Sequence, residues 1–421
     1  MIFIYSLFIN LIFIISPIIF FFRLLKKKED PNRFKEKLCF FSKKRSKGNL
    51  VWFHGASVGE ILSVIPLIEK LEKNKKINQI LVTTNTLSSS KILANIKLKK
   101  TVHQFFPIDT NFHSKRFLDY WKPKTVFFID SEIWPNMITN IKKRNISLGL
   151  INARITKKTF NKWKFFISSS KTIFSKFDLC LSSNFESIKH LKLLGAKKIK
   201  YIGNLKFAQT EKKEIFLNNI IKNKLISRMV WCAASTHNTE EKICAIAHRK
   251  LRTKYKDLLT IIIPRHINRT NKIIEEMEQL NLKVHTHKSK KNIDADTDIY
   301  LVNSYGQSKP FFKFCKTVFL GGSLIKHGGQ NPLEPAMYGC KILHGPNVWN
   351  FREVYSLLKQ HKVSHKVNSL KEIINNVDKL FKDKTSSQNI KIKIKHLGNK
   401  ILNLTSKEVN LLLVKNDNKK T

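Results

Sequence analysis

Acidic residues are scarce in this chain. Only 30 Asp and Glu residues oppose 78 Lys and Arg residues among 421, which gives a formal net charge of +48. The basic excess is mostly lysine and is spread along the chain instead of forming one patch. Zinc-finger spacing, an aromatic RNA-binding signature and basic heptads are also lacking, which argues against a nucleic-acid partner. Attraction to anionic lipids is the simplest consequence of this charge.

Cysteine pairs and dinucleotide fingerprints are missing as well. The six cysteines form no C-x-x-C pair and do not cluster with histidines, which argues against a zinc site or a disulfide framework. Cys180 and Cys232 fall in apolar runs that are typical of core strands. The absence of G-x-G-x-x-G counts against a nicotinamide-dependent enzyme. We therefore expect no metal site and no cofactor.

Long uncharged runs are absent except at the N-terminus, where Ile2–Phe22 carries no charge. A helix of roughly 20 apolar residues can span a bilayer. Arg23 and Lys26–Lys28 follow at once, so the positive-inside rule places the rest of the chain in the cytoplasm. The run lacks the basic start and small-residue cleavage site of a signal peptide. We expect residues 1–24 to form a single-pass membrane anchor.

After the anchor, apolar strand-like runs alternate with amphipathic helical stretches in two sets. The first set of expected strands is Asn49–His54, Gln79–Thr84, Thr125–Asp130, Ser147–Asn152, Leu179–Ser183 and Lys200–Gly203. The second set is Val230–Ala234, Leu258–Pro264, Lys283–His287, Ile299–Asn303, Thr317–Leu320 and Lys341–Leu343. Such alternation predicts α/β domains with parallel sheets. We expect two Rossmann-like domains facing a cleft, at 35–210 and 211–400, followed by a basic tail at 401–421.

The glycine-rich stretch Val318–Arg352 predicts a strand, a loop and a helix that begins at Asn331 and Pro332. Asn331 suits the cap and Pro332 the first helical position. Glu334 then falls in the first turn. A helix start can bind an anion, and a nearby carboxylate can accept hydrogen bonds from a ribose, which suggests a sugar-nucleotide site. An ordinary turn between strand and helix explains the same spacing equally well.

Carboxylates follow two strands of the first set. Ser57 and Glu60 have capping-box spacing, yet a carboxylate at a helix start is also kept ionised, as a general base requires. Asp130 and Glu132 lie at the end of the expected strand Thr125–Asp130, where they can support a positively charged transition state or bind hydroxyl groups. The structural alternatives are that Asp130 caps a helix and that Glu132 pairs with a lysine. Both interpretations stay open for each carboxylate.

Cations follow other strands. Arg154 and Lys206 can attract an acidic ligand, although a single surface charge is usually only solvated. In the second set, Pro264-Arg265-His266 follows a strand, so Arg265 can grip a phosphate and His266 can hydrogen-bond the ligand. Surface turns are the alternative. Ligands of parallel sheets bind outside the carboxyl ends of the strands, where all these residues are expected to lie.

Together the motifs resemble the Kdo (3-deoxy-D-manno-octulosonic acid) transferases of lipopolysaccharide biosynthesis. They are SVGE at 57–60, SEIWPN at 131–136, NAR at 152–154, GNLKF at 203–207, STH at 235–237, PRH at 264–266, and GGSL with GGQNPLEP at 321–335. The resemblance extends to about Val354. It implies a GT-B glycosyltransferase fold, CMP-Kdo as donor, lipid IVA as acceptor and inverting transfer at the cytoplasmic side of the inner membrane, beside its anionic lipids.

The resemblance also implies residue roles. Glu60 is the proton acceptor, Asp130 and Lys206 support the transition state, and Glu132 is counted with them. The residues implied to contact CMP are Pro264, Arg265, His266, Tyr305, Gly306, Gln307, Asn331, Pro332, Leu333 and Glu334.

Some positions depart from the family pattern. Asp130 and Gln307 stand where glutamate is expected, and Asn303 where aspartate is expected. Lys158, Ala208 and Gln330 replace arginine, aspartate and histidine, in that order. These departures keep two alternatives open: a membrane-anchored, catalytically weak relative that binds lipid and nucleotide, and another GT-B nucleotide-sugar transferase.

Overall fold

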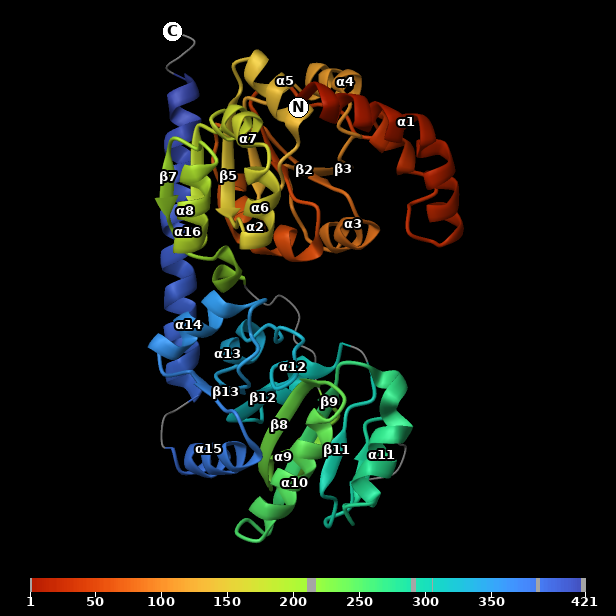
Figure 1. Ribbon diagram of the computed structural model, residues 1–421, viewed down its shortest axis with the longest axis vertical. Helices are drawn as coiled ribbons and strands as arrows, with labels where there is room; N and C mark the ends of the chain where they lie inside the picture. The colour runs from red at the N-terminus through yellow and green to blue at the C-terminus, as the bar shows by residue number, and fades with distance from the viewer. Residues whose placement is uncertain (1, 210–216, 289–292, 305, 384–386, 418–421) are drawn as a thin grey trace. The chain divides into compact units, whose positions relative to one another are not determined.

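The computed structural model describes residues 2–209, 217–288, 293–304, 306–383 and 387–417. The chain divides into two compact units (Figure 1). The first comprises Met1–Thr210 together with Leu397–Thr421, and the second comprises Glu211–His396.

The first unit is built on a seven-stranded parallel sheet of order β3-β2-β1-β4-β5-β6-β7. Its strands are β1 (Leu50–His54), β2 (Gln79–Thr84), β3 (Thr101–Phe105), β4 (Thr125–Ile129), β5 (Ser147–Ala153), β6 (Leu179–Ser182) and β7 (Ile199–Tyr201). The strand order reverses between β1 and β4, and ligands of doubly wound sheets bind at such a switch point.

Helices connect and cover these strands. They are α1 (Ile2–Leu25), η1 (Phe34–Leu38), α2 (Val58–Glu72), α3 (Leu87–Ala94), α4 (Asn111–Trp121), α5 (Pro135–Lys143), α6 (Lys157–Lys164), α7 (Ile167–Phe174), α8 (Phe185–Leu193) and η2 (Leu205–Ala208). Helix α1 is long and apolar enough to cross a membrane.

The second unit repeats the plan with a seven-stranded parallel sheet of order β10-β11-β9-β8-β12-β13-β14. Its strands are β8 (Met229–Thr236), β9 (Leu258–Pro264), β10 (Val284–Thr286), β11 (Ile299–Leu301), β12 (Thr317–Leu320), β13 (Lys341–His344) and β14 (Ser364–Lys366). Its helices are α9 (Asn219–Ile226), α10 (Glu240–Arg252), η3 (Ile267–Arg269), α11 (Thr270–Glu278), α12 (Ser308–Phe312), α13 (Leu333–Met337), α14 (Arg352–Gln360) and α15 (Leu370–Lys382). The predicted pair of α/β units is confirmed.

Large apolar side chains fill the core of each unit. In the first, Trp52 packs against Phe117 with ring centroids 4.9 Å apart. In the second, Trp231 and Phe319 are fully buried. Each such side chain contributes roughly 1.5–3 kcal/mol through the hydrophobic effect. All six cysteines are buried and unpaired, and Cys180 and Cys232 are core residues as predicted.

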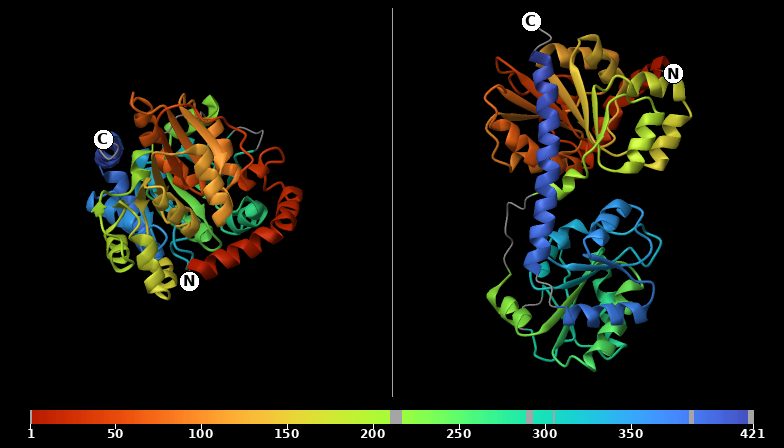
Figure 2. Two further views of the ribbon diagram at one scale, coloured as in Figure 1. Left: turned by 90° about the horizontal axis from the view of Figure 1, so that it is seen from above. Right: turned by 90° about the vertical axis from the view of Figure 1, so that its left-hand side faces the viewer.

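The segment expected to be a basic tail is instead the end of a long helix, α16 (Ser387–Asp417), which is conspicuous in the right-hand view of Figure 2. Ile401, Val409 and Leu412 are buried in the first unit. Their spacing of three and eight residues places them on one helix face, while Lys407 between them is exposed. The expectation overlooked this apolar stripe, although residues 401–421 contain five leucines and only four lysines. Residues 418–421 lie outside the described part of the chain.

Candidate active site

Glu60 lies in the first turn of α2, directly after the loop that leaves β1. The hydroxyl of Ser57 donates to Glu60 Oε1 (2.6 Å) and accepts from the Glu60 amide (3.3 Å), while the Ala56 amide donates to Oε2 (2.7 Å). Burial raises the pKa of Glu60, and the Ser57 hydrogen bond opposes that rise. Ser57 therefore caps the helix, and Glu60 holds the loop before it. The carboxyl group of Glu60 also has the raised basicity that suits a general base.

Asp130 follows β4 in a left-handed conformation, with φ 59°. Its amide donates to the Ile151 carbonyl (2.9 Å), and its carbonyl accepts from the Arg154 amide (3.2 Å). Burial raises the pKa of Asp130 to about 6, against the attraction of Lys206. The idea that Asp130 caps the next helix is wrong, because α5 begins only at Pro135 after Trp134.

Glu132 is held by two aromatic side chains instead of a lysine. Trp134 Nε1 donates to Oε2 (2.9 Å), and His54 Nε2 lies 3.2 Å from the same oxygen. The other ring nitrogen of His54 lies 2.9 Å from Thr83 Oγ1. Burial alone raises the pKa of Glu132, but the hydrogen bonds from His54 and Trp134 outweigh it and lower the pKa. Glu132 is thus a stable carboxylate.

The cations come from the loops after β5 and β7. Asn152 Oδ1 accepts from the Leu205 amide (2.9 Å) and Asn204 Oδ1 from the Lys206 amide (3.0 Å), so two asparagines hold the turn that carries Lys206. Lys206 and Arg154 both act on the carboxyl group of Asp130 electrostatically, as do Glu60 and Glu132. The first unit therefore gathers three carboxyl groups and two cations at the carboxyl ends of its strands.

In the second unit, the backbone of the glycine-rich loop binds the carboxylate of a glutamate that the sequence interpretation missed. Glu240, fully buried at the start of α10, accepts hydrogen bonds from the amides of Gly322 (2.6 Å), Ser323 (3.1 Å), Leu324 (3.0 Å) and His237 (3.0 Å). These amides are consequently not available to a ligand. The glycines instead permit close packing, since a Cβ on Gly321 would lie 2.5 Å from the Ser235 carbonyl oxygen.

The helix expected to begin at Asn331 and Pro332 begins at Leu333 and has only five residues. Asn331 Oδ1 still accepts from the Leu333 amide (3.2 Å), so its side chain satisfies one amide at the helix start. Glu334 lies in the first turn, and Lys309 Nζ of α12 lies 3.6 Å from its Oε1. This pair joins α13 to α12, which begins directly after Gly306 and Gln307. Tyr305 lies outside the described residues.

The STH, PRH and glycine-rich loops meet at the carboxyl edge of the second sheet. Pro264 ends β9, and the Arg265 amide donates to the Thr236 carbonyl (2.9 Å). The ring of His237 lies 5.5 Å from that of His266 and 4.2 Å from that of His327. Burial lowers the pKa of His237 to about 4, and the neighbouring His327 adds to this effect. A neutral His237 therefore lies at this edge, next to the loop that carries Arg265.

Metal ligands do not gather within the part of the chain that the structure describes: no group of three or more His, Cys, Asp and Glu residues is arranged to hold an ion. Asp294 and Asp296 form an Asp-x-Asp pair, which the sequence interpretation overlooked. Asp296 lies at the surface and pairs with Lys283.

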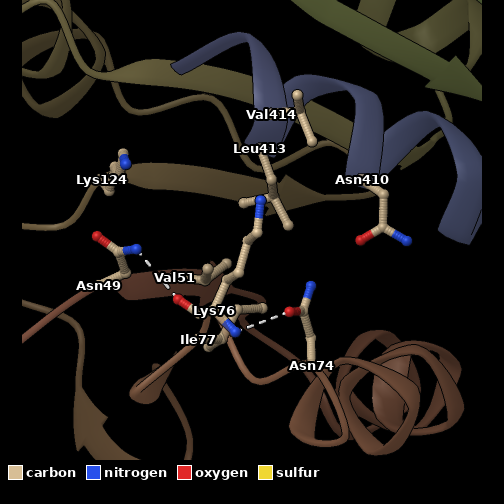
Figure 3. A pocket seen from close by; sticks show the side chains of 9 residues that line it. All are labelled: Asn49, Val51, Asn74, Lys76, Ile77, Lys124, Asn410, Leu413 and Val414. Atoms are coloured by element: carbon tan, nitrogen blue, oxygen red, sulfur yellow. Dashed lines mark hydrogen bonds between the residues drawn. The ribbon is translucent and has the colours of Figure 1, made fainter. Parts of the chain in front are cut away.

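A cavity of about 250 Å³ lies away from all these residues (Figure 3). Asn49, Lys76 and Lys124 line it together with Asn410 of α16. Because β1 begins at Leu50 and β4 at Thr125, the cavity is at the amino ends of the strands. It is therefore separate from the carboxyl-end cluster.

Known proteins resemble this chain over most of its length. Residues 32–209 match the family model described as 3-deoxy-D-manno-octulosonic-acid transferase (kdotransferase). The 3-deoxy-D-manno-octulosonic acid transferase of Rickettsia bellii is 33% identical over 385 residues, which cover 90% of this chain and 91% of that protein. The Haemophilus influenzae protein of the same name is 29% identical and covers 81% of each chain.

Solved structures support the fold. The UDP-GlcNAc 2-epimerase from Neisseria meningitidis bound to UDP-GlcNAc aligns with a TM-score of 0.57 and 14% identity over 87% of this chain and 100% of that one. Anabaena Alr3699/HepE in complex with UDP aligns with a TM-score of 0.54 and 9% identity over the same shares. These likenesses confirm the GT-B architecture of two parallel-sheet α/β domains. From its 33% identity to a full-length relative, the chain belongs to the 3-deoxy-D-manno-octulosonic acid transferase family.

Proposed function

We propose that this protein transfers Kdo from CMP-Kdo to lipid IVA with inversion at the anomeric carbon. The observation that carries the proposal is the carboxyl-end cluster of the first unit, in which Lys206, Arg154, Glu60 and Glu132 all act electrostatically on Asp130, and Glu132 acts on Glu60. Family membership supports the donor sugar, and the cluster supports chemistry that needs a base beside opposite charges.

The first step is proton removal from a sugar hydroxyl of the acceptor by Glu60. A carboxyl group with a raised pKa accepts that proton more readily than an ordinary one. The hydroxyl oxygen attacks the anomeric carbon of Kdo from the face opposite CMP, and the bond to the phosphate oxygen breaks. Asp130 and Glu132 stabilise positive charge that develops on the sugar, and Lys206 attracts its carboxylate.

The leaving group is CMP, whose phosphate needs little protonation. In this scheme Arg265 neutralises the phosphate, with Pro264, His266, Gly306 and Gln307 beside it. Glu334 accepts hydrogen bonds from the ribose, and Asn331, Pro332 and Leu333 shape the wall next to it. No cofactor beyond the donor is required, because the phosphate ester already supplies the bond energy.

Helix α1 anchors the enzyme to the inner membrane, with both units on the cytoplasmic side. The order of charges supports this orientation, since Arg23 and three lysines follow the apolar run. Anionic lipids attract the basic surface, and the same attraction holds the enzyme near a phosphorylated lipid acceptor.

Binding without efficient turnover is a second candidate. Asp130 and Gln307 favour it, because both stand where the family resemblance predicts glutamate: aspartate is one methylene shorter, and glutamine carries no charge. Incubation of the detergent-solubilised protein with CMP-Kdo and lipid IVA, followed by mass spectrometry of the lipid, distinguishes the two. We expect the mass of one or more Kdo units to be added. CMP binding with an unmodified lipid would instead establish the weak relative, and transfer from a different nucleotide sugar would identify another GT-B enzyme.

A further inference from the structure

The amino-terminal end of α1 is fastened to the first unit by polar contacts. Tyr5 donates a hydrogen bond to Asp109 Oδ2 (2.9 Å), and Ser6 donates one to Asn136 Oδ1 (2.6 Å). Asp109 lies just before α4, and Asn136 lies in the first turn of α5. Figure 1 shows α1 beside α4 and α5. Asp109 also accepts from the Met137 amide (2.7 Å), so the contact belongs to a buried network.

The other end of α1 is fastened to the same unit. Ser16 and Phe20 are buried, and the ring of Phe20 lies 5.7 Å from that of Phe34. Arg23 Nε donates to Glu29 Oε1 (2.6 Å). Contacts therefore exist at both ends and in the middle of the helix.

One face of α1 packs on the first unit, and the opposite face is exposed and apolar. The ring of Phe13 also lies 4.8 Å from that of His113 in α4. The contacting residues 5, 6, 13, 16, 20 and 23 recur at helical spacing, so they share the face toward the first unit. The opposite face exposes large apolar side chains, among them Ile4, Leu7, Leu11, Ile14, Ile18 and Phe22. Phe112, next to α1 on α4, is 63% exposed and extends this apolar surface.

These contacts conflict with a helix that crosses the bilayer. Residues 5 and 23 are about 27 Å apart along a helix, close to the thickness of the hydrocarbon core. A crossing helix would place Tyr5 and Ser6 at the far side of the membrane from Asp109 and Asn136. It would also leave the exposed Asn10 near the centre of the bilayer, where a polar amide is costly. A helix that lies along the membrane surface keeps the contacts of Tyr5 and Ser6. It also places Asn10, which lies between the inner and outer faces of the helix, at the level of the headgroups.

We propose that α1 is an in-plane anchor, which stays packed on the first unit and inserts its outer face into the cytoplasmic leaflet without crossing the bilayer. Acyl chains fit this face because the side chains along its centre are all apolar. The adjoining Arg23 and Lys26–Lys28 then lie level with anionic headgroups. The inference rests on the membrane anchoring proposed above and specifies its geometry.

The position of the N-terminus tests the geometry. A short uncharged extension with one cysteine is placed before Met1 of the full chain, whose own six cysteines are buried. Intact spheroplasts are treated with a membrane-impermeant maleimide. We expect no labelling until the membrane is permeabilised. Labelling in intact spheroplasts would show a crossing helix and overturn the proposal, provided that the exposed control Ser227→Cys in the second unit stays unlabelled.

Crosslinking tests the docking itself. In the Ser6→Cys, Asn136→Cys double variant, mild oxidation of membranes should join the two cysteines, which mass spectrometry detects as one linked peptide. The Leu11→Cys, Asn136→Cys variant is the matched control, because Leu11 faces outward, and it should not crosslink. Equal yields in the two variants would refute docking. Failure of the wild-type chain to float with phosphatidylethanolamine–phosphatidylglycerol vesicles would instead refute membrane anchoring. A disulfide between the Leu11→Cys residues of two copies in the control variant would assign the outer face to a second copy of the chain.

Discussion

Three carboxyl groups at one edge of the first sheet are prepared for different tasks by their surroundings. Burial raises the pKa of Glu60 and Asp130, whereas His54 and Trp134 overcome burial and lower the pKa of Glu132. Neighbouring carboxyl groups with diverging pKa values are typical of catalytic sites. The proposed base and the proposed permanent anion are therefore different residues.

Replacement of the proposed base tests its role. Glu60→Gln keeps the shape of the side chain but removes its basicity, so turnover should fall by roughly a hundredfold or more. Ser57→Ala is the matched control: it removes the cap, costs about 1 kcal/mol of stability and leaves the carboxylate in place. Steady-state kinetics and thermal melts measure both effects. Near-normal turnover in Glu60→Gln would mean that Glu60 only holds the loop before its helix.

Asp130→Asn should stabilise the protein while it lowers activity. The folded pKa of about 6 exceeds the ordinary 3.8, so the wild-type carboxyl group binds its proton more tightly when folded, and its favourable contribution is lost as pH rises through 6. The asparagine side chain of the variant does not ionise, so it loses no stability as pH rises, and asparagine tolerates a left-handed backbone. We expect a gain of about 1–3 kcal/mol above pH 6 that vanishes below pH 4. Denaturant melts across that range measure it; a pH-independent difference would contradict the assignment.

The nucleotide site is tested at Glu334 and Asn331. Glu334→Ala should weaken CMP binding by about 1.5–3 kcal/mol if it removes charge-assisted hydrogen bonds to the ribose. Asn331→Ala should also destabilise the fold by about 1 kcal/mol, because its Oδ1 accepts from the Leu333 amide. Calorimetric titration with CMP and thermal melts give both quantities. Unchanged CMP affinity in both variants would place the nucleotide elsewhere.

Among the elements, the central strands were predictable, because buried parallel strands read as continuous apolar runs. The edge strands β3 and β14 were missed. Thr101–Phe105 mixes polar and apolar residues, and Ser364–Lys366 contains no aliphatic residue at all. Edge strands need only one neighbour, so their sequences are less constrained than those of central strands.

The candidate site was predictable only in part. Glu60, Asp130 and Glu132 follow strands directly, so local pattern places them. The roles of His54 and Glu240 depend on partners 78 and 82 residues away, at Glu132 and Gly322. Such pairing is created by the register of the sheets and leaves no local pattern.

The glycine-rich loop should loosen when its buried acceptor is changed. Glu240→Gln turns one acceptor oxygen into a donor that faces backbone amides, at a cost of about 1–3 kcal/mol. We expect faster hydrogen exchange at Gly322–Leu324 and weaker CMP binding. Glu241→Gln is the control, since Glu241 is equally buried and pairs with Arg269 instead of the loop. Equal exchange at the loop in both variants would contradict this role of Glu240.

At the scale of the whole molecule, we expect the charge of +48 to act chiefly through the basic residues next to the proposed anchor. Each lysine close to an anionic surface contributes about 1 kcal/mol of attraction. Changing Lys26, Lys27 and Lys28 to glutamine should therefore weaken binding to anionic vesicles by about 2–3 kcal/mol, and more salt should shrink the difference. Vesicle flotation measures it. The same change at Lys254, Lys256 and Lys379 of the second unit is the control, and equal losses would show that total charge matters instead of position.

Helix α16 gives the chain an order of assembly. Ile401, Val409 and Leu412 cover the first unit, and a Cβ on Gly398 would lie only 2.1 Å from the Phe207 carbonyl oxygen, beside Lys206. During synthesis, the half of the protein that is made first thus lacks part of its hydrophobic cover until residues near 412 have left the ribosome. The second unit can complete its own core earlier. The half that carries the proposed base is therefore the last to close, so a nascent chain has no finished catalytic site.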